Sequence, residues 1–312
     1  PQALLRRLKS GDAIAHTITL IFGATIILIT VLLVYQLWIH SAPSRAKFGL
    51  HFFATSTWDP VAEDFGALPF IYGTLVTTVV ALTIAIPLGL GAAIFLSELA
   101  PPKLSAGLSY VIDLLAAVPS VIYGMLAIFT LLPLMASKIE PFLKRNLGFL
   151  PLFRGPAYGV GLLSAGLVLT VMIVPYIISV SREVLMAVPR DQREAALGLG
   201  ATRWESTWRV VVPFARSGIM GSILLSMARA LGETMAVTMV IGNTPKISAS
   251  LLSPGYSIAA VIANEFSEAT GAVYISSLVE LGLVLFLLTF ILNGLARILI
   301  TLTAQKGSEV TA

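Results

Sequence analysis

The amino-acid sequence predicts an all-α membrane protein with six transmembrane helices. Its 312 residues have a mean hydropathy of +0.92, and 57% of them are hydrophobic. Only 12% are charged, about half the share found in soluble domains, whose surfaces face water. Six apolar stretches reach the ~20 residues needed to cross a bilayer. Lipid must therefore cover much of the surface of the folded chain.

The six predicted spans differ in their ionisable content. The first four contain no ionised side chain, whereas the fifth and sixth carry ionisable residues inside an apolar run. We expect the spans at residues 13–40, 68–97, 114–136, 159–181, 214–242 and 274–300.

The distribution of Lys and Arg predicts that both termini are cytoplasmic. With the N-terminus inside, about 12 basic residues fall on cytoplasmic segments and about 7 on outer ones. The first apolar stretch exceeds the h-region of a signal peptide and lacks a small-x-small cleavage site, so we expect an uncleaved helix. We divide the chain into an N-terminal unit, residues 1–67, and a transmembrane domain, residues 68–303. The outer loops at 41–67 and 243–273 are long enough to receive a soluble partner.

Several functional classes find no support in the sequence. His16, His40 and His51 have no Asp, Glu or Cys at ligand spacing, so we expect no metal site. Cysteine is absent, which removes disulfides and thiolate nucleophiles. No serine–histidine–acid arrangement is suggested, so we expect no catalytic residue. Clustered basic faces of the kind that bind nucleic acid are not visible outside one loop.

That loop, residues 187–213, connects spans four and five. Pro189 favours a helix start, Gly200 permits a turn, and 201–212 forms a second helical run that we expect to end at Pro213. A basic loop of this kind could also lie on anionic lipid headgroups.

The loop resembles the EAA motif of binding-protein-dependent ABC importer permeases. Glu194, Ala195 and Ala196 are followed after three residues by Gly200, and after nine more by a run that closes on Pro213. The sequence departs from the family pattern only where Val replaces Ile and Leu. In that family the loop docks in a cleft of a separate ATPase and couples its closure to the membrane helices.

The resemblance implies a type I (MetI-like) ABC importer permease fold. Spans two to six would form a five-helix core, with the first helix peripheral. The chain has no GxxxxGK[ST] loop, so ATP and Mg would be used by the partner ATPase, and we expect no cofactor on this chain.

Two ionisable residues stand out in span five. Arg229 lies about 16 residues beyond Pro213, roughly mid-membrane, and Glu233 would follow one helical turn later, about 6 Å along the axis. A charge at that depth costs a few kcal/mol, so both should face the bundle interior or a water-filled path. They could form an internal ion pair. Alternatively, the guanidinium could bind an oxyanion, and the carboxylate could accept the proton that hydrogen phosphate carries and sulfate lacks.

Three segments resemble the PstC family of permease subunits in phosphate ABC importers, and the likeness extends from about residue 11 to 303. The segments are residues 65–77, 119–124 and 228–243. The resemblance implies phosphate import across the bacterial cytoplasmic membrane by alternating access, with Arg229 and Glu233 on the translocation path. It implies a PstA-like second permease, two copies of a PstB-like ATPase and a PstS-like phosphate-binding protein outside. Sulfate or molybdate is the alternative cargo, and an ion-driven secondary transporter would leave the EAA loop unexplained.

Four further polar residues are candidates for the path. Ser120, Tyr123 and Asn243 could line it, or could bond to neighbouring helices as lone polar groups in membrane helices commonly do. Glu280 in span six lies near the outer third, where it could serve the path or pair with another group.

Overall fold

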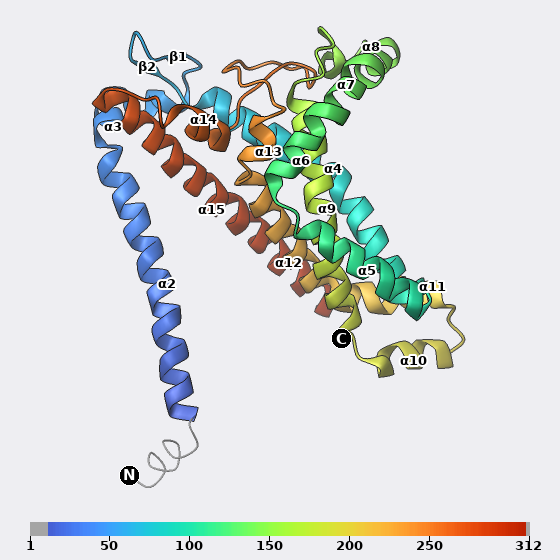
Figure 1. The fold of residues 1–312 in the computed structure, drawn as a ribbon. Helices are drawn as coiled ribbons and strands as arrows, with labels where there is room; N and C mark the ends of the chain where they lie inside the picture. The colour runs from blue at the N-terminus through green and yellow to red at the C-terminus, as the bar shows by residue number, and fades with distance from the viewer. Residues whose placement is uncertain (1–11, 310–312) are drawn as a thin grey trace, which may run out of the picture.

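The computed structural model describes residues 12–309, with side chains for residues 15–298, and is built almost entirely of helices (Figure 1). Two short antiparallel strands of two residues each, β1 Trp58–Asp59 and β2 Asp64–Phe65, form a small sheet. The α-helices are α2 Asp12–His40, α3 Ala42–Phe48, α4 Leu68–Ile94, α5 Pro102–Ala116, α6 Ser120–Leu126, α7 Leu132–Leu134, α8 Glu140–Leu147, α9 Leu162–Met186, α10 Arg190–Gly198, α11 Arg203–Ser206, α12 Val212–Leu231, α13 Met235–Thr238, α14 Ile258–Glu265 and α15 Ala272–Glu309.

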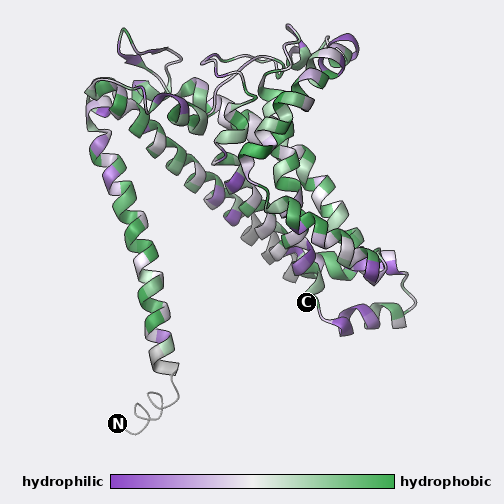
Figure 2. Ribbon diagram, viewed as in Figure 1, coloured by the Kyte–Doolittle hydropathy of each residue, from purple (hydrophilic) through white to green (hydrophobic). Residues whose placement is uncertain are grey.

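Six helical segments of the described chain are long and apolar enough to span a membrane, which confirms the predicted number. Apolar residues dominate these segments, and hydrophilic residues interrupt them where α12 gives way to α13 (Figure 2). The segments are Ala15–His40, Leu68–Leu99, Ser120–Leu147, Leu162–Met186, Arg203–Leu231 and Ala272–Ile298. Three of the basic residues counted on the cytoplasmic segments, Arg6, Arg7 and Lys9, lie outside the described residues.

The predicted third span, 114–136, was wrong at its start. Its first three residues belong to α5, and the span begins only at Ser120. Pro119 explains the break, because proline lacks an N–H and disfavours helical geometry at the residue before it. The Tyr123 hydroxyl bridges the break by donating to the Leu115 carbonyl at 2.7 Å.

Prolines also shape the helices that continue. A proline removes one α-helical hydrogen bond and crowds the carbonyl four residues earlier, and a shift to i→i+5 bonding relieves both problems. Four π-helical segments occur in the described chain, and each ends two residues before a proline. The segments are Phe95–Leu99, Ala127–Leu131, Met135–Ile139 and Thr207–Val211. After the first of them the helix ends at Ala100, whereas after the other three the chain continues through the proline as α-helix. The loop helix that we expected to end at Pro213 therefore passes through it into α12.

Helix α9 forms the centre of the bundle (Figure 1). Two-thirds of its most apolar stretch, 67%, is buried inside this one chain. It packs closely on α4 because glycines remove side chains from the contact. A Cβ on Gly89 would lie 2.6 Å from Cγ2 of Ile177, and one on Gly166 would collide with Val80. Leu169, Ile173 and Ile177 therefore form the middle of the apolar core.

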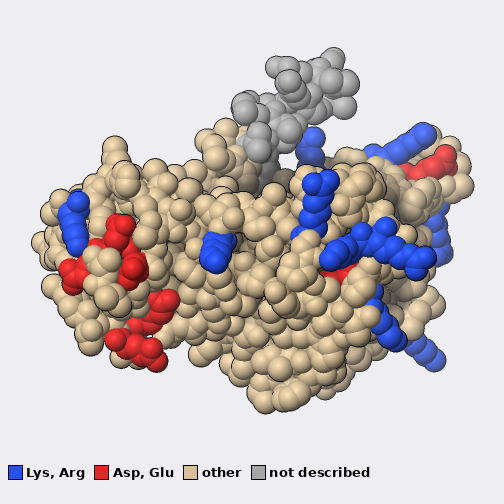
Figure 3. All heavy atoms as spheres, turned by 90° about the horizontal axis from the view of Figure 1, so that it is seen from above, with Lys and Arg blue, Asp and Glu red and all other residues tan. Residues whose placement is uncertain are grey.

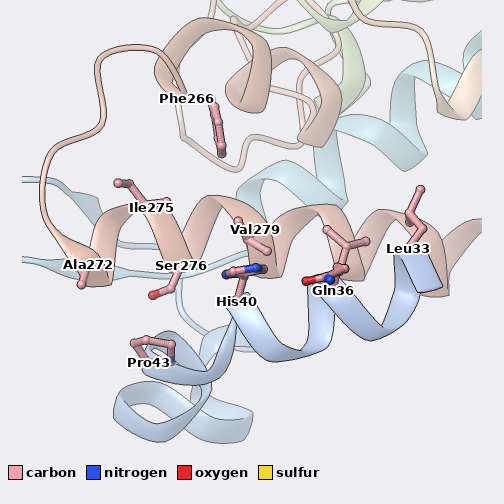
Figure 4. A pocket seen from close by; sticks show the side chains of 10 residues that line it. Leu33, Gln36, His40, Pro43, Phe266, Ala272, Ile275, Ser276 and Val279 are labelled. Atoms are coloured by element: carbon pink, nitrogen blue, oxygen red, sulfur yellow. The ribbon is translucent and has the colours of Figure 1, made fainter. Parts of the chain in front are cut away.

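Helix α2, in contrast to α9, is packed against little of its own chain. None of its most apolar stretch is buried, and Figure 1 shows it leaving the other helices along most of its length. Near its C-terminal end it runs beside α15, and a groove of about 710 Å³ separates the two helices (Figure 4). His40 and Gln36 of α2 face Ser276 and Val279 of α15 across this groove.

Candidate functional site

The EAA loop is a helix, a turn and a second helix at the end of the molecule opposite α14 (Figure 1). Gly200 has φ +89°, a conformation that glycine adopts without strain, and it reverses the chain after α10. A capping box then starts α11. The Thr202 hydroxyl accepts from the Glu205 N–H at 3.3 Å, and the Glu205 carboxylate accepts from the Thr202 N–H at 2.9 Å.

The motif residues of this loop are open to solvent in the isolated chain. Glu194, Ala195 and Gly200 are exposed and Ala196 is half-buried. A groove of about 500 Å³ runs past the two alanines and Gly200. Beside it Leu199 is 91% exposed, an apolar side chain with nothing of its own chain to cover it. Small residues and an uncovered leucine suit the docking of another protein. Pro213 is exposed at the start of α12.

The sequence analysis missed an ion pair and a capping box at this loop. Arg193, directly before the motif, forms a bidentate ion pair with Glu98 at the end of span two, with an Nη2–Oε1 distance of 2.9 Å. No local pattern indicates this pair, because its members lie 95 residues apart. The Thr202-x-x-Glu205 pattern, in contrast, is a readable capping signal.

Span five is broken at the position of the two predicted ions. Helix α12 ends at Leu231, and Glu233 lies in the turn before α13. Its carboxylate accepts from the Ala236 N–H at 3.2 Å. Among the described residues no ion pair joins Arg229 to Glu233. The prediction of one continuous helix, 214–242, was therefore wrong, because Glu233 lies outside the helix that carries Arg229.

Arg229 is exposed in the isolated chain although it lies within a membrane-spanning segment. Its guanidinium carbon is 5.8 Å from the ring centroid of Tyr176 on α9, within cation–π range. Its charge also acts on the hydroxyl of Tyr123 on α6. The break thus brings one cation and two phenol rings together from three separate spans.

The other predicted path residues fall in different places. Ser120 is half-buried at the start of α6, the helix that carries Tyr123. Asn243 has φ +45°, and its amide donates to the Thr238 carbonyl at 3.0 Å, so it caps α13. Glu280 is 2% exposed, and Ser44 and Arg45 of α3 lie near its side chain. The contacts of Glu280 are therefore with the segment that follows α2.

On the face that carries α14, one carboxylate links three elements through hydrogen bonds. Glu265 accepts from Trp58 Nε1 at 2.8 Å and from the Tyr274 hydroxyl at 2.7 Å, which joins β1 to α14 and α15. Nearby, burial raises the pKa of Tyr256 to about 12, so its hydroxyl is neutral at physiological pH and accepts from the Asn264 amide at 3.0 Å.

Charge is unevenly spread over this face. Figure 3 shows acidic side chains gathered at one end, over β1, β2 and α14, and basic side chains at the other end, where α8 lies. The acidic residues are Asp59, Glu63, Asp64, Glu265 and Glu268, and the basic ones are Lys138, Lys144, Arg145 and Arg154.

Solved structures show which class of protein has this arrangement. The MetNI methionine ABC transporter in an inward-facing conformation matches with a TM-score of 0.52 at 20% identity, covering 73% of this chain and 93% of that one. The fold is that of type I ABC importer permeases, which confirms the predicted fold class and makes the chain a multi-pass membrane protein.

Sequence comparisons identify the family. The model for "Binding-protein-dependent transport system inner membrane component" matches residues 85–304. The "Phosphate transport system permease protein PstC" of Mesorhizobium japonicum is 45% identical, covering 98% of this chain and 95% of the relative. The proteins of the same name from Xylella fastidiosa (48%, covering 83% and 81%) and Haemophilus influenzae (47%, covering 93% and 93%) agree. The chain therefore belongs to the PstC family of binding-protein-dependent permeases.

Proposed function

We propose that this chain is a permease subunit of an ATP-driven importer that carries inorganic phosphate across the cytoplasmic membrane by alternating access. The observation that carries the proposal is the 45% identity to a phosphate transport permease over 98% of the chain. Sulfate and molybdate are the competing cargoes.

The EAA loop supports an ATPase as the motor partner. Its small motif residues and Leu199 are uncovered in this chain, and the sequence has no phosphate-binding loop of its own. ATP and Mg would therefore be bound by two copies of a PstB-like subunit, one of them seated on Glu194, Ala195 and Gly200.

The exposure of Arg229 supports a second permease subunit. A guanidinium open to hydrocarbon is costly, and such groups face a protein interior or a water-filled cavity. A PstA-like subunit packed on this side would turn the exposed break into the wall of a shared path. The uncovered length of α2 provides a further surface for the same partner.

The orientation of the chain in the membrane follows from the proposed docking of an ATPase on the EAA loop. The EAA loop meets a cytoplasmic ATPase, so both termini are cytoplasmic and the face that carries α14 is outside. A PstS-like binding protein would dock there, over a surface whose opposite ends differ in charge (Figure 3). Because the chain has no cysteine, a single cysteine at Lys144 or Arg297 reports orientation by its reactivity toward an impermeant reagent. We expect only the first to react from outside.

The chemistry of the break favours an oxyanion. Arg229 offers a permanently charged planar fork, and the Tyr176 ring lies beside it. The Glu233 carboxylate would accept a hydrogen bond from the P–OH group of hydrogen phosphate, a group that sulfate lacks.

The test is uptake of labelled phosphate and sulfate by the complete reconstituted complex. We expect phosphate uptake in the wild type and its loss in Arg229→Gln, with Arg297→Gln, the same change at an exposed cytoplasmic position, as the matched control. Sulfate uptake that exceeds phosphate uptake would overturn the assignment of cargo. If Glu233→Gln retains both uptake and the preference for phosphate, this account of Glu233 is wrong.

A further inference from the structure

The nine residues of α10 have little to hold them in place. None of them is buried, so the helix that would receive the force of an ATPase is not anchored by a hydrophobic core. Above it the inner ends of α4, α9 and α12 pack into a single apolar cluster that includes Ala93, Leu185 and Ala215. A movement of α10 can reach that cluster through the side chains that contact both.

One side chain supplies such contacts. Arg193 of α10 donates through Nε to Oε2 of Glu98 at 3.0 Å and through Nη2 to Oε1 at 2.9 Å. The same guanidinium donates from Nη2 to the Leu185 carbonyl at 2.7 Å and from Nη1 to the Val188 carbonyl. It thus connects α10 with the end of span two and the end of span four.

The surroundings make this a stiff connection. The side chains of Arg193 and Glu98 are 21% and 9% exposed, so water screens the pair little. A bidentate guanidinium–carboxylate contact constrains orientation as well as distance. Leu185 and Val188 present carbonyls at the end of α9, where helical partners are missing and the helix dipole attracts a cation.

We propose that Arg193 and Glu98 form the mechanical link that transmits movement of α10 to spans two and four. This inference rests on the proposed function, since it presumes an ATPase that drives α10. Both are positioning residues, because neither is placed on the substrate path or among the exposed residues assigned to ATPase docking. Loss of the link would leave ATP hydrolysis intact and uncouple it from transport.

The primary measurement is the number of phosphate ions imported per ATP hydrolysed, at equal amounts of assembled complex. Arg193→Gln is expected to lower this ratio by roughly tenfold, the effect of losing a charge-assisted contact. Arg193→Lys, which keeps the charge and loses the fork, should give an intermediate ratio. Arg190→Gln, an exposed arginine three residues earlier in α10, is the matched control and should leave the ratio unchanged. A merely structural role would lower assembly and leave the ratio as in the wild type, which would overturn the proposal.

A second measurement does not depend on the cargo. The chain is free of cysteine, so spin labels at Leu88→Cys on α4 and Leu197→Cys on α10, both exposed, report one distance. In the wild type we expect one narrow distribution of label-to-label distances, with the same mean in nucleotide-free and ATP-bound complexes. In Arg193→Gln we expect this distribution to broaden. If Arg193→Gln fails to assemble, Arg193→Lys is measured in the same way.

The two measurements separate the two claims. A wild-type complex that imports no phosphate refutes the proposed function, and the label distance still decides the link. An equally narrow, unchanged distance in the Arg193 variant refutes the link whatever the cargo.

Discussion

Gly73 of α4 lies against the main chain of Tyr256, and we predict that Gly73→Ala destabilises the subunit. A Cβ at this position would lie 2.9 Å from the carbonyl carbon of Tyr256 and closer still to its oxygen. Carbon atoms in contact are ~3.5–4.0 Å apart, so the two segments must separate by at least roughly 0.6 Å. The segment is also held to α4 by the bond from the Ile258 N–H to the Thr74 hydroxyl at 3.0 Å, which opposes the shift.

The magnitude follows from two opposing effects. Overpacking of this kind costs about 1–3 kcal/mol. Replacing glycine inside a helix returns about 0.5–1 kcal/mol, because alanine loses less chain entropy on folding. The net loss is then on the order of 1–2 kcal/mol, or a fall of a few degrees in the unfolding midpoint.

Gly91→Ala is the matched control, since it lies in the same helix and a Cβ there would have no neighbour within 4 Å. Thermal unfolding of the purified complex in detergent compares the two variants with the wild type. We expect a lower midpoint for Gly73→Ala and an equal or higher one for Gly91→Ala. Equal midpoints for both variants would refute the close approach of α4 to Tyr256.

Two further changes test contacts at opposite ends of the molecule. Trp58→Phe removes a 2.8 Å hydrogen bond to Glu265 and should lower the unfolding midpoint. The expected loss of stability is about 1.5–3 kcal/mol, the range for a hydrogen bond to a charged group. An unchanged midpoint would contradict the role of Glu265 in joining β1 to α14. Thr202→Ala removes the hydroxyl of the capping box, worth about 1 kcal/mol, and should speed proteolytic cleavage between α10 and α11. Cleavage at the wild-type rate would show that the cap does not hold this turn.

The number of spans was predictable because insertion of a helix depends on its own composition. The EAA loop was predictable for a related reason, since its motif is contiguous and exposed. Residues 1–67 and 68–303 stay a proposed division of the chain, and the roles of Arg229 and Glu233 stay predictions.

The errors arose where geometry depends on a short break or on a distant partner. A single Gly232 gave no clear stop signal within an apolar run, yet the helix ends there and Glu233 turns to cap α13. Glu280 was ambiguous because its neighbour, Ser44, comes from a segment more than 200 residues away. The pair formed by Arg193 and Glu98 could not be read from spacing for the same reason.

The sparse packing of α2 has a consequence for how the chain is made. It is synthesised before the other described helices, and its main neighbour within the chain, α15, begins about 230 residues later. At ~5–20 residues per second, α2 waits roughly 10–50 s in the bilayer before that neighbour exists. It must therefore be retained by its own affinity for lipid, and it is the most apolar of the six spans. The high hydropathy of α2 thus suits a helix that must stay in the bilayer before its packing partner has been made.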